Sequence, residues 1–158
     1  MLRRTATGAE VAEDPFVRLG EDDAVPADGA VLVPFERWSD ELAGRDAPVG
    51  VIVPGSAEAK DVAPLLDRVP LVAITFPKFT DGRGYSLARS LRERYGFRGE
   101  LRAVGDVLRD QLFYMARCGF DAFELKEGKD VEDALSAFED FSVTYQPATD
   151  RAEPLWRR

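Results

Sequence analysis

The chain has 158 residues, about the length of one domain, with hydrophobic residues at 45% and charged residues at 32%. It has no histidine and a single cysteine, which excludes a Cys/His zinc site, a Ser-His-Asp triad and an internal disulfide. A net charge of −8 argues against binding to a nucleic-acid backbone, and no apolar run is long enough to span a membrane. The arginine pair near the N-terminus lacks the apolar stretch of an export signal, so we expect a cytoplasmic protein.

Residue types divide the chain into three regions. Residues 1–29 are rich in Ala, Gly, Asp, Glu and Pro and predict a poorly ordered or edge-strand N-terminal segment. Residues 30–147 alternate short apolar runs with segments of helical periodicity, which predicts an α/β domain. Residues 148–158 predict a C-terminal tail, with Trp156 available to dock on the domain or on a partner.

The expected elements alternate regularly between strand and helix. The strands are, in chain order, Ala30–Val33, Val49–Val53, Leu71–Phe76, Leu101–Val104, Ala122–Leu125 and Val143–Tyr145. The helices are Phe35–Leu42, Ala57–Leu66, Gly84–Tyr95, Val107–Arg117 and Val131–Phe141. This pattern predicts a single α/β domain with a mainly parallel sheet of about five to six strands flanked by helices, either Rossmann-like or half-barrel-like.

Basic residues are unevenly distributed. From Lys78 to Arg117 the chain carries nine basic and five acidic residues, a formal charge of +4, while the remainder carries −12. Such a segment can attract an anion to one region of an acidic protein. The alternative is that these arginines cover the solvent faces of two helices.

The densest cluster of polar, glycine and aromatic residues follows the predicted strand Leu71–Phe76. Loops at the carboxyl ends of parallel strands share one side of the sheet, where ligands bind. Paired glycines at a helix start let backbone N–H groups approach an anion, so we expect a small-oxyanion site there, or else a structural turn capped by Asp81. The expected ligand-binding residues are Lys78, Asp81, Gly82, Arg83, Gly84, Tyr85 and, from the next loop, Arg109.

Two carboxylates in these loops are candidate catalytic residues, Asp81 and Asp106. An enzyme would use one of them as general acid or base, with Tyr85 or Ser86 as a hydrogen-bonding group. Asp106 has an alternative role as the cap of a helix that begins at Val107. The glycine pair matches no nucleotide motif and no redox-cofactor signature is present, so we expect neither a cofactor nor a metal.

Cys118 and Gly119 mark the end of the predicted helix Val107–Arg117. Glycine favours a left-handed helix stop. A cysteine at a helix C-terminus meets the negative end of the helix dipole, which disfavours the thiolate. We therefore expect Cys118 to be a buried, unreactive side chain.

Four segments carry a family resemblance: Phe76–Ser86, Leu91–Gly96, Gly105–Gln111 and Met115–Phe120. They resemble a bacterial family called domain of unknown function 934. A weaker likeness at Val33–Trp38 and Phe141–Pro147 extends it over most of the chain. Genes of that family commonly lie beside those for sulfite reductase and adenylylsulfate-type reductases, and its members are often described as probable oxidoreductases in sulfite reduction.

The resemblance implies a place in sulfur metabolism. We expect an accessory protein of assimilatory sulfate or sulfite reduction, which binds a sulfur oxyanion or a phosphosulfate-type ligand or docks on sulfite reductase or an adenylylsulfate-type reductase. The alternative is an oxidoreductase whose active site is the Lys78–Arg83 loop with Asp106. A homo-oligomer is compatible with either role.

Overall fold

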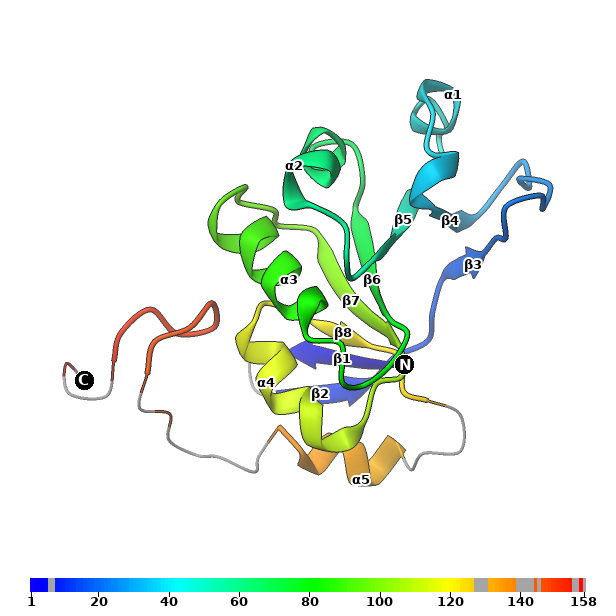
Figure 1. Ribbon diagram of the computed structural model, residues 1–158. Helices are drawn as coiled ribbons and strands as arrows, with labels where there is room; N and C mark the ends of the chain where they lie inside the picture. The colour runs from blue at the N-terminus through cyan, green and yellow to red at the C-terminus, as the bar shows by residue number, and fades with distance from the viewer. Residues whose placement is uncertain (6–7, 127–130, 139–143, 145, 155–156, 158) are drawn as a thin grey trace.

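The computed structural model describes residues 1–5, 8–126, 131–138, 144, 146–154 and 157, and within them one eight-stranded sheet forms the centre of the fold (Figure 1). The strands are β1 (Leu2–Thr5), β2 (Gly8–Val11), β3 (Phe16–Arg18), β4 (Ala30–Pro34), β5 (Val49–Pro54), β6 (Leu71–Phe76), β7 (Glu100–Gly105) and β8 (Ala122–Phe123). The α-helices are α1 (Asp40–Ala43), α2 (Ala59–Val62), α3 (Arg83–Glu93), α4 (Leu112–Arg117) and α5 (Val131–Ser136). Three 3-10 turns accompany them in the described chain, η1 (Phe35–Arg37), η2 (Ala63–Leu65) and η3 (Arg109–Gln111).

The strand order is β2-β1-β8-β7-β6-β5-β4-β3. Strands β3 to β8 are consecutive neighbours and parallel, whereas β1 and β2 join the far edge antiparallel. This order does not reverse as a doubly wound sheet does, so the half-barrel-like fold is confirmed and the Rossmann-like alternative is wrong. The prediction of five to six strands fits the parallel part but undercounts the sheet, because strands near the N-terminus complete both edges.

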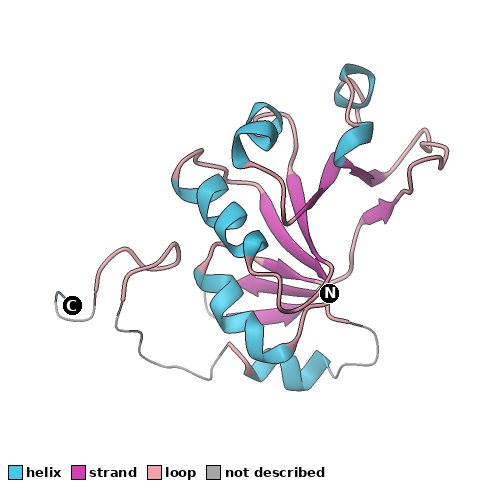
Figure 2. Cartoon of the chain, in the orientation of Figure 1, coloured by secondary structure: helices cyan, strands magenta, loops and turns pink. Residues whose placement is uncertain are grey.

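The sheet curls strongly (Figure 2). Residues 12–15 join β2, at one edge, to β3, at the other. Five residue steps span at most about 18 Å, whereas the edges of a flat sheet with this many strands lie roughly 34 Å apart. The two edges therefore approach each other, and the inner face of the sheet becomes the interior of a half-barrel.

The two faces of the sheet are packed differently. On the outer face, alternate strand residues such as Val53, Ile74 and Ala103 join Leu87 and Leu91 of α3 in the main core. Figure 1 shows α3 and α4 together on this side of the sheet. On the inner face, a smaller cluster contains Leu32, Leu71, Ala73 and Val104, with Phe16 and Ile52 at its border. Burial on both faces explains why β5 and β6 are almost uniformly apolar.

An arginine lies inside the half-barrel. Arg102 of β7 is 0% exposed, and its guanidinium is 2.6 Å from Asp14 Oδ2 and 2.8 Å from Glu100 Oε1. It also lies 5.7 Å from the ring centroid of Phe16. Phe16 belongs to the edge strand β3 and Asp14 to the segment that leads into it, so this cluster connects β7 to that edge across the interior.

Several helix boundaries differ from the prediction. The expected helix Ala57–Leu66 is divided into α2 and η2, and the expected helix Val131–Phe141 lies outside the described residues from residue 139 on. The expected helix Phe35–Leu42 is divided into η1 and α1, because Trp38 between them is extended. The expected helix Val107–Arg117 begins only at η3, because Gly105 has a φ of 98° and Leu108 is extended. The predicted left-handed stop at Gly119 is confirmed by its φ of 110°.

The C-terminal part is described incompletely. The predicted strand Val143–Tyr145, except residue 144, and the predicted docking residue Trp156 lie outside the described residues. Among the described residues, no helix is both long and apolar enough to cross a membrane.

Candidate functional site

A pocket of about 460 Å³ opens at the carboxyl ends of β3, β4, β5 and β6. We call it the mouth pocket. Its charged and hydroxyl-bearing lining residues are two arginines, three carboxylates and two hydroxyls: Arg18, Arg83, Glu21, Glu36, Asp81, Ser56 and Thr75. Ligands of parallel barrels and half-barrels bind at this end of the strands, because variable loops surround it while the sheet holds their ends in place.

Several polar groups of the mouth pocket are available to a ligand. Among the described residues, the hydroxyls of Ser56 and Thr75 have no hydrogen-bond partner. Arg18 is about half exposed at its side chain (49%) and lies 3.7 Å from Glu124 Oε1, a loose ion pair. Two hydroxyl donors and a weakly held guanidinium therefore face the same cavity.

Asp81 and Arg83 form an ion pair at the edge of the mouth pocket. Arg83 Nε and Nη2 donate to Asp81 Oδ1 and Oδ2 at 2.9 and 2.7 Å, and the Arg83 backbone N–H donates to Oδ1 at 3.2 Å. These hydrogen bonds lower the pKa of Asp81 to about 2. Asp81 is therefore a carboxylate at neutral pH, and an entering anion would compete with it for Arg83.

The two predicted loop glycines have different surroundings. A Cβ on Gly84 would lie 2.7 Å from Phe76 Cζ, so glycine is what allows the start of α3 to pack on β6. A Cβ on Gly82 would meet nothing within 4 Å. Gly84 thus has a packing role, and neither glycine lines the mouth pocket.

The predicted rim residues do not form a single cluster. Arg109 donates to Ser136 Oγ at 2.8 Å and lies 3.3 Å from Asp133 Oδ2, so its guanidinium faces α5. Lys78 is exposed on the loop and does not line the mouth pocket. The structure brings Asp81 and Arg83 together with Arg18, and it places Arg109 elsewhere.

Asp106 holds two loops together. Its Oδ2 accepts the Phe79 N–H at 3.1 Å, and its Oδ1 accepts Lys126 Nζ at 2.9 Å. The prediction that it caps a helix at Val107 is wrong, because no helical turn begins there. Asp106 also does not line the mouth pocket, so the two candidate catalytic carboxylates do not share it.

Tyr85 packs between α3 and α4. Its ring centroid lies 5.2 Å from that of Phe76 and 5.3 Å from that of Tyr114, and burial raises its pKa to about 12. Ser86 is exposed on α3. Neither side chain lines the mouth pocket.

Sequence reasoning missed Arg18, Ser56 and Thr75. Arg18 lies in the N-terminal segment, and only the pairing of β3 with β4 brings it to the pocket. Ser56 did have a signal, because Pro54-Gly55-Ser56 directly follows an apolar strand, the position where parallel sheets bind ligands. Among the described residues, no group of three or more Cys, Asp or Glu side chains forms a metal site.

The family model for bacterial proteins of unknown function (DUF934) matches residues 50–156. The chain belongs to this family. The match begins within β5, so the Asp81–Arg83 loop of this DUF934 protein lies inside it and Arg18 lies outside it. No curated protein matches the chain.

Cys118 is buried as predicted, with 6% of its surface exposed. Burial raises the pKa of its thiol, which further reduces the thiolate fraction at neutral pH. We expect slow labelling by a thiol reagent in native protein and fast labelling after unfolding in urea. Equal labelling rates in the two states would show that the thiol is accessible in the fold.

Proposed function

We propose that this protein binds a small sulfur oxyanion or a phosphosulfate-type ligand in the mouth pocket, as an accessory protein of assimilatory sulfate or sulfite reduction. The observation that carries the proposal is the meeting of Arg18, Arg83, Ser56 and Thr75 in one pocket at the carboxyl ends of the strands. Guanidinium groups bind two oxygens of one anion, and hydroxyls bind the others. The sulfur pathway itself follows from the family resemblance.

The ionisation of Asp81 favours a binding role over acid catalysis. With a pKa of about 2, Asp81 has no proton to give at neutral pH and is a weak base. Its two hydrogen bonds hold Arg83 at the pocket edge until an anion arrives. Docking on sulfite reductase or an adenylylsulfate-type reductase is the other form of this accessory role, and co-purification from cells growing on sulfate tests it.

Arg83→Ala is expected to weaken anion binding at least about tenfold. Each lost charge-assisted hydrogen bond is worth roughly 1.5–3 kcal/mol, and about 1.4 kcal/mol corresponds to a factor of ten. The measurement is the rise in melting temperature with sulfite, sulfate and adenylyl sulfate at constant ionic strength. Lys60→Ala is the matched control, because Lys60 is exposed on α2, carries the same charge and does not line the mouth pocket.

Asp81→Asn separates binding from catalysis. Removing the competing carboxylate should strengthen anion binding and leave growth on sulfate intact, since an amide oxygen still accepts the Arg83 N–H. An enzyme that used Asp81 as acid or base would lose that growth. Full growth with a normally folded Arg83→Ala protein, in a strain lacking its own copy, would mean that the loop is structural.

A further inference from the structure

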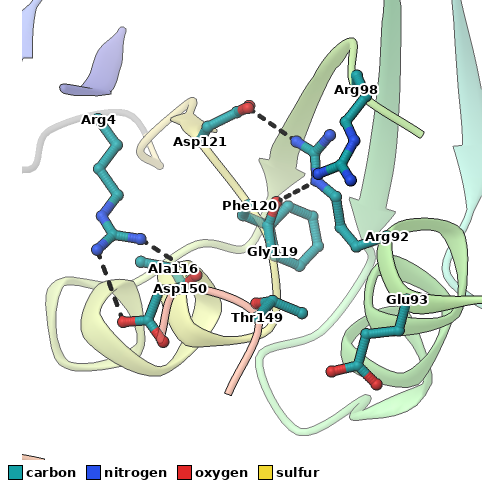
Figure 3. A pocket seen from close by; sticks show the side chains of 10 residues that line it. All are labelled: Arg4, Arg92, Glu93, Arg98, Ala116, Gly119, Phe120, Asp121, Thr149 and Asp150. Atoms are coloured by element: carbon teal, nitrogen blue, oxygen red, sulfur yellow. Dashed lines mark hydrogen bonds and ion pairs between the residues drawn. The ribbon is translucent and has the colours of Figure 1, made fainter. Parts of the chain in front are cut away.

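A second pocket, of about 330 Å³, lies at the opposite end of the parallel strands (Figure 3). Two of its lining residues place it there, because Arg98 precedes β7 and Asp121 precedes β8. Its walls also include Arg4 of β1, Arg92 of α3 and Thr149 of the C-terminal segment. We call it the base pocket, and it shares no lining residue with the mouth pocket.

Arg92 is rigidly held in the base pocket. Its guanidinium donates to the carbonyl oxygens of Gly119, Phe97 and Gly99 and to Asp121 Oδ2, at 2.7–2.9 Å. These bonds use four of its five N–H groups and leave only 14% of the side chain exposed. A guanidinium fixed in this way is a preorganised positive charge in the wall of a cavity.

Arg98 lies beside Arg92 and is not neutralised. It has no hydrogen-bond or ion-pair partner among the described residues, and its charge helps to lower the pKa of Arg92, although burial is the larger cause. Arg4 is held only loosely, at 3.5 Å from the Ala116 carbonyl oxygen and 3.7 Å from Asp150 Oδ2. Figure 3 shows the guanidiniums of Arg98 and Arg92 close together, with Arg4 on the other side of the pocket.

The carboxylates around the base pocket already have arginine partners. Asp121 pairs with Arg92 at 2.8 Å, Asp150 lies 3.7 Å from both Arg4 and Arg117, and Glu93 pairs with Arg89 at 3.0 Å. The lining residues themselves contain three arginines and three carboxylates, and adding the outer partners Arg89 and Arg117 brings the formal charge to +2. This excess stands out in a protein with a net charge of −8.

We propose that the base pocket is a second, independent ligand site, which binds a tetrahedral dianionic oxyanion such as inorganic phosphate or sulfate between Arg98, Arg92 and Arg4. Arg98 and the loosely held Arg4 can each direct a guanidinium fork at two oxygens of the anion, and Arg92 contributes its fixed positive charge and one remaining N–H. The site also accounts for part of the basic segment between Lys78 and Arg117, because Arg92 and Arg98 line it and Arg89 and Arg117 pair with its carboxylates.

The test is a titration of ¹⁵N-labelled protein with inorganic phosphate and, separately, with sulfate, at constant ionic strength. We expect saturable shifts of the Gly119, Asp121 and Thr149 amide signals. Arg98→Ala should weaken this binding at least about tenfold, whereas Arg94→Ala should leave it unchanged. Arg94 carries the same charge a few residues away, is exposed beside Tyr95 and does not line the base pocket.

Three outcomes would overturn the proposal. One is an equal effect of Arg98→Ala and Arg94→Ala, which would indicate general attraction by surface charge. The second is shifts that do not saturate or that spread over the whole surface, which would indicate an adventitious ion only. The third is equal binding of acetate, which would contradict selection of a dianion. Arg98→Gln keeps most of the stem and repeats the test without a packing change.

The two sites can fail separately. Arg83→Ala should leave the shifts of Gly119, Asp121 and Thr149 unchanged, because Arg83 lies at the mouth pocket. Arg98→Ala should likewise leave the signals of the Asp81–Arg83 loop unchanged. Loss of binding at one pocket therefore does not contradict the proposal made for the other pocket.

Discussion

Arg102→Ala is expected to lower the free energy of unfolding by about 2–5 kcal/mol, because a fully buried side chain and its ion pairs are removed together. The guanidinium is 0% exposed and is bound by Asp14 and Glu100. Without it, Asp14 loses its ion-pair partner, Glu100 keeps only Arg3 at 3.0 Å, and the connection between β7 and the β3 edge is lost. Urea denaturation monitored by circular dichroism measures the change.

Two controls accompany this prediction. Arg94→Ala removes an exposed arginine and should change the unfolding free energy by less than about 0.5 kcal/mol. Arg102→Met keeps much of the volume but removes the charge. If Arg102→Met is as stable as the parent protein, packing alone holds the interior, and the ion pairs contribute little.

Leu112→Ala should cost about 2–5 kcal/mol of stability, through the lost burial and the cavity that remains. Leu112 is 0% exposed in the main core, on α4. Leu112→Met conserves the volume and should cost less than about 1.5 kcal/mol. The midpoint of urea unfolding, compared at constant m-value, gives the stability loss of each variant. A loss below about 1 kcal/mol for Leu112→Ala would mean that neighbouring side chains fill the space left by the smaller residue.

Local patterns were enough to locate the parallel strands from β4 to β8. The apolar runs at Leu71–Phe76 and Val49–Val53 correspond to β6 and β5, and β6 has the predicted limits. Residues 16–18 were not assigned a definite strand, because three residues in a polar context carry little periodic signal. Residues 16–18 form a strand because their backbone groups pair with those of β4.

The candidate site was predicted only in part. The Asp81–Arg83 loop could be found because it combines glycine and charge at the end of a strand. The rim with Lys78 and Arg109 did not form as one cluster, because side-chain direction depends on the φ of 98° at Gly105 and on the later start of the helix. Arg18 could not be predicted at the mouth pocket, because it lies in β3, far along the chain from the Asp81–Arg83 loop, and only the folded sheet brings the two together.

The sequence by itself determined the α/β class, the positions of strands β4 to β8 and the exclusion of histidine and disulfide chemistry, since these depend on composition and on periodicity over a few residues. Only the tertiary structure decided that Arg102 lies inside and that Arg98 lies beside Arg92. Arg102 and Asp14 are 88 positions apart, and their contact exists only because the sheet curls until its edges approach. The alternation of apolar and polar residues along a strand predicts which face of the strand is buried. It does not predict which charged residue, distant in the sequence, will contact that face.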